Sequence, residues 1–119
     1  MTIASSLAVA FVALLHAGFL VLEMFLWNKP LGRRVFGLAP DVTAAAAPLA
    51  ANQGLYNGFL AAGLVWGLVL GAAGFDVKVF FLACVIVAGV FGAVTARRSI
   101  LWFQALPGAI ALALVLLAR

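Results

Sequence analysis

A glutamate and a histidine interrupt the first apolar stretch of the chain, which covers residues 2–27. Glu23 lies one helical turn before Trp27, and His16 precedes Glu23 by seven residues. Since seven residues make about two helical turns, both side chains lie on one helix face, about 10 Å apart along the axis. A charged carboxylate inside a membrane helix costs roughly 3 kcal/mol, so such groups face a polar partner, a wet cavity or the interface. We therefore predict a catalytic pair, with Glu23 as proton acceptor or counter-ion and His16 as a second titrating group.

Simpler explanations of this pair stay open from the sequence. Glu23 can be a structural carboxylate paired with Lys29, Arg97 or Arg98, and His16 can be a hydrogen-bonded core histidine. No metal site is expected, because the chain has one histidine, no H-E-x-x-H motif and no cluster of carboxylates. Nucleophile arrangements and nucleotide fingerprints are absent from the sequence as well, so no cofactor is expected.

A second group of polar side chains opens the next apolar stretch. Asn52 and Tyr56 are four residues apart, as are Gln53 and Asn57, so each pair shares a helix face. Gln104 is expected to lie toward the same cytoplasmic leaflet as these residues and Glu23. These five side chains either form interhelical hydrogen bonds, which are common in membranes, or they line a small cavity open to the cytoplasmic side. On the second hypothesis they are binding residues that orient a ligand by hydrogen bonds. Glu23 is expected to lie close to side chains among Asn52, Tyr56, Asn57 or Arg98, because a carboxylate within a membrane needs partners.

The composition indicates the elements that position these residues. Of 119 residues, 68% are hydrophobic and 8% charged, which is too apolar for a soluble domain of this size. A spanning helix needs about 20 apolar residues, so the length allows four spans. We predict an all-α integral membrane four-helix bundle with antiparallel neighbours, forming a single domain over residues 1–119. Its helices are expected at about residues 2–27, 49–74, 77–95 and 100–117, with a kink at Pro107. One long loop is expected over 31–48, in which residues 41–47 could form a helical turn capped by Asp41 or Thr43.

The basic residues predict orientation rather than nucleic-acid binding. The net charge is +4, but the seven basic residues flank apolar stretches instead of forming one patch. Five lie on one expected side and two on the other: Lys29, Arg33, Arg34, Arg97 and Arg98 against Lys78 and Arg119. The positive-inside rule places the five in the cytoplasm and both termini outside. The lone cysteine, Cys84, lies in an apolar stretch and is expected to be a packing residue.

Glycines recur at helical spacing in the second predicted helix. Gly54 and Gly58 are four residues apart, and Gly63, Gly67 and Gly71 continue this spacing. Faces of small residues allow helix backbones to approach closely in membranes. They serve packing within the bundle or between subunits, and we expect a homo-oligomer as one use of these faces.

The helix with His16, Glu23 and Trp27, followed by the segment 52–61, resembles a known family. It is a bacterial family of four-helix inner-membrane proteins of about this length, designated a domain of unknown function. The resemblance covers nearly the whole chain and implies an integral protein of the inner membrane, without implying an activity. Membrane-associated glutathione enzymes and small multidrug exporters are weaker comparisons: the former carry Arg and Glu in a polar stripe that segment 52–57 lacks, and the latter carry one first-helix glutamate.

Three hypotheses for the function follow. The leading one is a polar pocket in the cytoplasmic leaflet that binds or acts on a small amphiphilic or lipid-like molecule. The second is a proton-coupled exporter of small molecules that acts as an oligomer. The third is a structural or accessory membrane subunit without chemistry. Membrane lipids are expected partners in all three.

Overall fold

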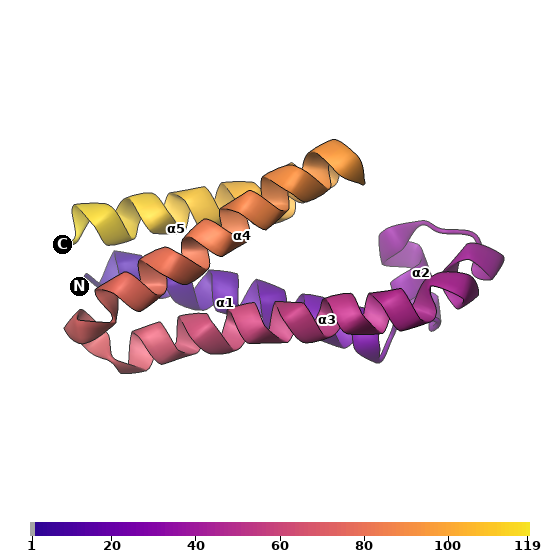
Figure 1. Cartoon of the computed structure of the whole chain (residues 1–119), viewed down its shortest axis with the longest axis horizontal. Helices are drawn as coiled ribbons and strands as arrows, with labels where there is room; N and C mark the ends of the chain where they lie inside the picture. Colours follow the sequence, from indigo (N-terminus) through magenta and orange to yellow (C-terminus); the bar gives the residue numbers. More distant parts are fainter. Residues whose placement is uncertain (1) are drawn as a thin grey trace. The chain divides into compact units, whose positions relative to one another are not determined.

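The computed structural model describes residues 2–119, and all regular structure in this range is helical (Figure 1). The predicted all-α fold class is confirmed. Five α-helices, one 3₁₀ helix and one π-helix make up these residues: α1 (Ile3–Met24), α2 (Pro30–Phe36), α3 (Pro40–Val69), η1 (Gly71–Gly74), α4 (Phe75–Thr95), η2 (Leu101–Ala105) and α5 (Leu106–Leu117).

The expected long loop over residues 31–48 is wrong, because this stretch is largely helical. Pro30 and Pro40 begin α2 and α3, positions where the missing N–H costs nothing and the fixed φ favours the helix. Gly37 ends α2 with a φ of 64°, a left-handed conformation that glycine adopts without strain. The alanines at 44–47, the best helix formers, then carry α3 through the region expected to be irregular.

Both ends of the second predicted helix, at 49–74, differ from the structure. Pro48, one residue before the expected start, lies inside α3, where it removes one backbone donor to the Ala44 carbonyl. The α-helix ends at Val69, and Gly71 follows with a φ of 64°. Leu70 separates the two helices, and the left-handed Gly71 begins η1, so the expected last turn of the helix is a short 3₁₀ segment instead.

The chain forms two compact units, each described by itself. The first consists of the residues up to Leu14 together with Leu60–Arg119, and the second is Leu15–Phe59. In the first unit α4 packs against α5 and η2, side by side in Figure 1. Its buried apolar core is contributed by α1, α3, α4 and α5: Val9, Val12, Ala13, Leu64, Leu82, Val85, Ala111 and Val115.

Close backbone approach holds α4 against the C-terminal helices. A Cβ built at Gly89 would lie 2.8 Å from the Ala105 nitrogen and 3.0 Å from its Cα. A Cβ at Gly108 would lie 2.9 Å from Cγ1 of Val85. Since both glycines are buried, the lack of a side chain is what allows these helices to meet at this distance.

The kink expected at Pro107 has a counterpart in η2, the π-helix immediately before it. The N–H of Leu106 donates to the carbonyl of Leu101, a five-residue spacing. Pro107 cannot donate a backbone hydrogen bond and its ring crowds the carbonyl four residues earlier, so a widened turn there relieves the conflict. Gln104 lies within this turn, and its Nε2 donates to the Val85 carbonyl at 3.0 Å.

Two helices of residues 2–119 are long and apolar enough to cross a membrane, namely Ile3–Met24 and Gly71–Thr95. A shorter apolar helix covers Leu101–Leu117. α3 is not among them: the polar residues at 52–57 lower the mean hydropathy of its C-terminal half.

Candidate functional site

Three polar side chains of the second unit form a continuous hydrogen-bonded chain between α1 and α3. His16 Nδ1 lies 2.9 Å from Asn57 Oδ1, and Asn57 Nδ2 donates to Glu23 Oε1 at 2.5 Å. His16 is fully buried and Asn57 is 6% exposed. The structure thus brings together both predicted catalytic residues and one predicted binding residue, in agreement with the expected contact between Glu23 and the 52–57 segment.

The amide of Asn57 determines the proton positions in this chain. Its nitrogen donates to Glu23, so its oxygen faces His16 and can only accept. His16 Nδ1 must therefore carry a hydrogen and donate to that oxygen. Nε2 of the same ring is buried and has no hydrogen-bond partner among the described residues. The ring itself is held edge-on against Phe19, with centroids 5.2 Å apart.

Two glycines of α3 allow Asn57 to reach α1. A Cβ built at Gly54 would lie 2.6 Å from Met24 Cγ and 3.1 Å from Glu23 Cβ. A Cβ at Gly58 would lie 2.6 Å from Leu20 Cδ1. These small residues bring the two helices close on either side of Asn57, so a short amide side chain is long enough to bridge His16 and Glu23.

The other predicted binding residues do not join this chain. Asn52, Gln53 and Tyr56 are exposed on α3, and Tyr56 packs edge-on against Phe59. Gln104 belongs to the first unit, where it bonds Val85. Within Leu15–Phe59, Glu23 accepts a hydrogen bond from the neutral amide of Asn57. Lys29, the cation of this unit that was considered as its partner, is exposed.

Sequence reasoning missed a contact that ties the end of α1 to α3. Trp27 donates from Nε1 to the Thr43 carbonyl at 2.6 Å and packs against Phe36 with centroids 4.7 Å apart. Thr43 is 2% exposed, and its hydroxyl donates to the Ala39 carbonyl rather than capping a helix. The polar composition of the 28–48 region predicted a loop, so no contact with Trp27 was expected there. A helix beginning near Thr43 would have been needed to suggest this contact.

A buried lysine was also missed. Lys78 was treated as a loop charge, yet it is 3% exposed within α4. The feature of the sequence that could have indicated its burial is the glycine spacing in α3. Gly67 makes room for the Lys78 side chain, because a Cβ there would lie 2.5 Å from Lys78 Cγ. Lys78 also lines a cavity of about 350 Å³ in the first unit, to which none of the predicted site residues contributes.

No group of three or more His, Cys, Asp or Glu side chains among residues 2–119 is placed to hold a metal ion. The polar chain itself consists of hydrogen-bonding groups, two of which carry exchangeable protons or a carboxylate. One end of the chain is the buried, unpartnered Nε2 of His16, and the other end is the Glu23 carboxylate.

Comparison with known proteins follows from this geometry. The family model described as "Protein of unknown function (DUF1304)" matches residues 10–116. An uncharacterized protein of Lactococcus lactis subsp. lactis (strain IL1403), YpaA, is 27% identical over 106 residues, covering 87% of this chain and 89% of that protein. No solved structure matches the chain. The resemblance to a bacterial domain-of-unknown-function family, noted from the sequence, is confirmed.

Proposed function

Since this chain belongs to the DUF1304 family, we propose that it is a multi-pass inner-membrane protein whose His16–Asn57–Glu23 chain forms a polar site for a small amphiphilic or lipid-like molecule. The observation that carries the proposal is the buried, unpartnered Nε2 of His16.

Exposed apolar surface supports the membrane placement. Only 28% and 22% of the most apolar windows of the two candidate spans are buried, so neither behaves as the core helix of a soluble protein. Large side chains such as Leu14, Phe91 and Val94 are 71%, 68% and 81% exposed. Apolar surface of this extent requires lipid or a partner. We propose that α1, α3, α4 and the continuous η2–α5 segment cross as an antiparallel four-helix bundle.

Topology is testable without knowledge of the ligand. On the proposed arrangement the five basic residues of the 28–48 region and the α4–η2 turn are cytoplasmic, and both termini are outside. A reporter fused after Arg119 is expected to be active in the periplasmic format, such as alkaline phosphatase, and inactive in the cytoplasmic format. The reverse pattern would move the His16–Asn57–Glu23 chain to the outer leaflet.

An unpaired buried ring nitrogen limits what the ligand can be. Leaving such a group without a partner costs about 1–3 kcal/mol, and a buried polar atom without a partner is often completed by a water or ligand. Because Nδ1 carries a hydrogen, Nε2 of the neutral ring is an acceptor. The ligand therefore needs a hydroxyl or another N–H or O–H donor at its polar end. It also needs a hydrocarbon part that can pack against the apolar surfaces of the surrounding helices.

Glu23→Gln tests the site against a purely structural role. Glutamine keeps the shape and an acceptor oxygen for Asn57 but removes the charge, and the partner it leaves is an amide rather than a cation. We expect a melting temperature in one detergent equal to or above that of the parent, because functional sites hold groups that folding disfavours. We also expect mass spectrometry of the extracted protein to show about tenfold less of a co-purified amphiphile, the effect of losing about 1.4 kcal/mol of binding.

Asn52→Leu is the matched control, since Asn52 is an exposed polar residue on the same helix. Its amphiphile content should equal that of the parent, and His16→Phe should match Glu23→Gln. A Glu23→Gln protein that melts well below the parent would indicate a structural carboxylate. Identical amphiphile content in all variants would leave the accessory-subunit hypothesis.

Proton-coupled export is the second candidate, favoured by one observation. Two titratable residues of α1 are joined through a single amide inside a candidate span. Such residues are typical of proton-coupled transport pathways. A substrate-driven pH change inside proteoliposomes, lost in Glu23→Gln, would indicate export, whereas a binding protein or enzyme would not acidify the lumen.

A further inference from the structure

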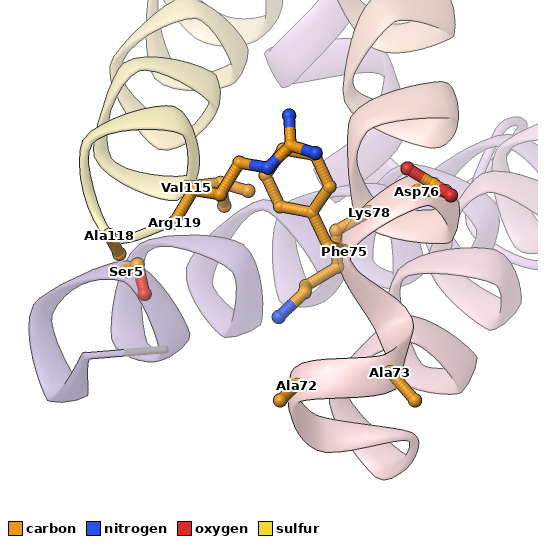
Figure 2. A pocket seen from close by; sticks show the side chains of 9 residues that line it. All are labelled: Ser5, Ala72, Ala73, Phe75, Asp76, Lys78, Val115, Ala118 and Arg119. Carbon is orange, nitrogen blue, oxygen red and sulfur yellow. The ribbon is translucent and has the colours of Figure 1, made fainter.

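The first unit contains a cavity of about 350 Å³ where the start of α1, η1, the start of α4 and the end of α5 meet (Figure 2). Most of its lining is apolar, and three lining residues carry ionisable side chains. The lining residues are Ser5, Ala72, Ala73, Phe75, Asp76, Lys78, Val115, Ala118 and Arg119. This cavity is separate from the His16–Asn57–Glu23 chain, which lies in the second unit.

Lys78 is built into the wall of this cavity. Its stem packs over Gly67, where any side chain would collide with Lys78 Cγ, and the residue is 3% exposed. Its Nζ reaches the Gly71 carbonyl at 3.5 Å, next to the left-handed turn between α3 and η1. In Figure 2 the ammonium points toward the side of the cavity formed by Ala72 and Ser5. Burial of this cation holds a positive charge at a defined position in the wall.

Arg119 adds a second cation, held by an aromatic ring. Its guanidinium carbon lies 4.6 Å from the centroid of Phe75, a distance typical of a cation–π interaction. Asp76 is exposed, and its carboxylate points away from the Lys78 ammonium in Figure 2. The hydroxyl of Ser5 is engaged by Thr2, to whose carbonyl it donates at 2.9 Å. The lining side chains therefore carry two positive charges and one negative charge.

From this arrangement we propose that the cavity binds a phosphate-bearing anion. Lysine and arginine together match the oxygens of a phosphate, with the guanidinium forming paired hydrogen bonds and the ammonium acting as a point charge. The apolar walls, including Val115 and Ala118, accept the hydrocarbon next to a headgroup. Basic pockets between membrane helices on the cytoplasmic side bind anionic lipid headgroups, and this cavity offers the same chemistry at the end of the helices that the proposed topology places outside. The bound phosphate group belongs either to an anionic lipid headgroup or to free phosphate, and the experiment below distinguishes these two ligands.

The test is thermal unfolding of the full chain in a neutral detergent with added phosphatidylglycerol, phosphatidylcholine or inorganic phosphate. Phosphatidylglycerol at about a hundred times its dissociation constant should raise Tm by at least about 5 °C, whereas phosphatidylcholine should leave it unchanged. Lys78→Met should abolish the shift and Arg119→Ala should reduce it at least about twofold. Arg34→Ala, an exposed basic residue of α2, is the matched control and should keep the full shift.

Arg119→Ala keeps the proposal testable if Lys78→Met does not fold, because Arg119 is exposed at the end of the described chain. A Tm shift with inorganic phosphate alone that both variants reduce would support the site and identify free phosphate as its ligand. An equal shift with phosphatidylcholine would overturn the proposal. So would a phosphatidylglycerol shift that every foldable variant of Lys78 and Arg119 leaves at the parent value.

Discussion

Replacing Asn57 with leucine is expected to lower the free energy of unfolding by about 3 kcal/mol, because each buried polar group left without a partner costs about 1–3 kcal/mol. Two groups lose their partner: the buried donor at His16 Nδ1 and the half-buried acceptor at Glu23 Oε1. An ordinary hydrogen bond between membrane helices contributes only about 0.6 kcal/mol. The orphaned partners, rather than the two lost bonds, therefore dominate the effect. Equilibrium unfolding in one detergent measures it.

Asn52→Leu again provides the matched control, since it makes the same chemical change on an exposed position of α3 and should change stability by no more than about 0.5 kcal/mol. The pair His16→Phe and Asn57→Leu should be less harmful together than the sum of the single changes, by about 1 kcal/mol, because the double variant removes one orphaned partner. Equal losses for Asn52→Leu and Asn57→Leu would contradict the buried chain.

A comparable loss is expected from Gly89→Leu, at about 3 kcal/mol or more. Overfilling a packed interface usually costs about 1–3 kcal/mol, and here the obstacle is the backbone of Ala105, 2.8 Å from the new Cβ, which cannot rotate away. α4 must therefore move from η2 and expose part of the core around Val85. The expected result is a lower melting temperature together with weaker protection of amide hydrogens in α4 and α5.

Gly18→Leu is the control for this substitution. No described atom lies within 4 Å of a Cβ built at Gly18, which is also in the middle of a helix. Leucine there gains up to about 1 kcal/mol of helix propensity over glycine, so stability should be equal or higher. A Gly89→Leu protein as stable as Gly18→Leu would show that the two helices are not held at this separation.

Much of the helical fold could be predicted because long apolar stretches leave few alternatives. α1 and α4 lie close to their predicted ranges for this reason. The 28–48 region was misjudged because prolines and basic residues resemble a loop in composition. Its structure depends on position: Pro30 and Pro40 each begin a helix, and alanines continue α3 through Pro48. Composition alone cannot distinguish a proline that starts a helix from one that ends it.

The candidate site could be predicted in part. Burial of a carboxylate requires a polar partner, and this requirement correctly linked Glu23 to the 52–57 segment. Helical spacing grouped Asn52, Gln53 and Tyr56 with Asn57 but could not say which face of α3 meets α1. Gly54 and Gly58 decide this, because the helices approach where side chains are smallest, and of the two polar residues between these glycines Asn57 faces α1. The remaining three side chains are left on the outer faces.

The π-helix η2 amounts to one surplus residue in an otherwise continuous C-terminal helix. Each residue of an α-helix advances the side-chain direction by about 100°. The wide turn absorbs that advance, so Gln104 bonds Val85 while Ala105, Gly108, Ala111 and Val115 still form one buried stripe. A homologue shortened by one residue between 101 and 105 would regain a regular helix. The side chains after the deletion would then be rotated about the helix axis by more than a quarter turn. To present the same buried surface to α4, the stripe would have to shift by one position in the sequence.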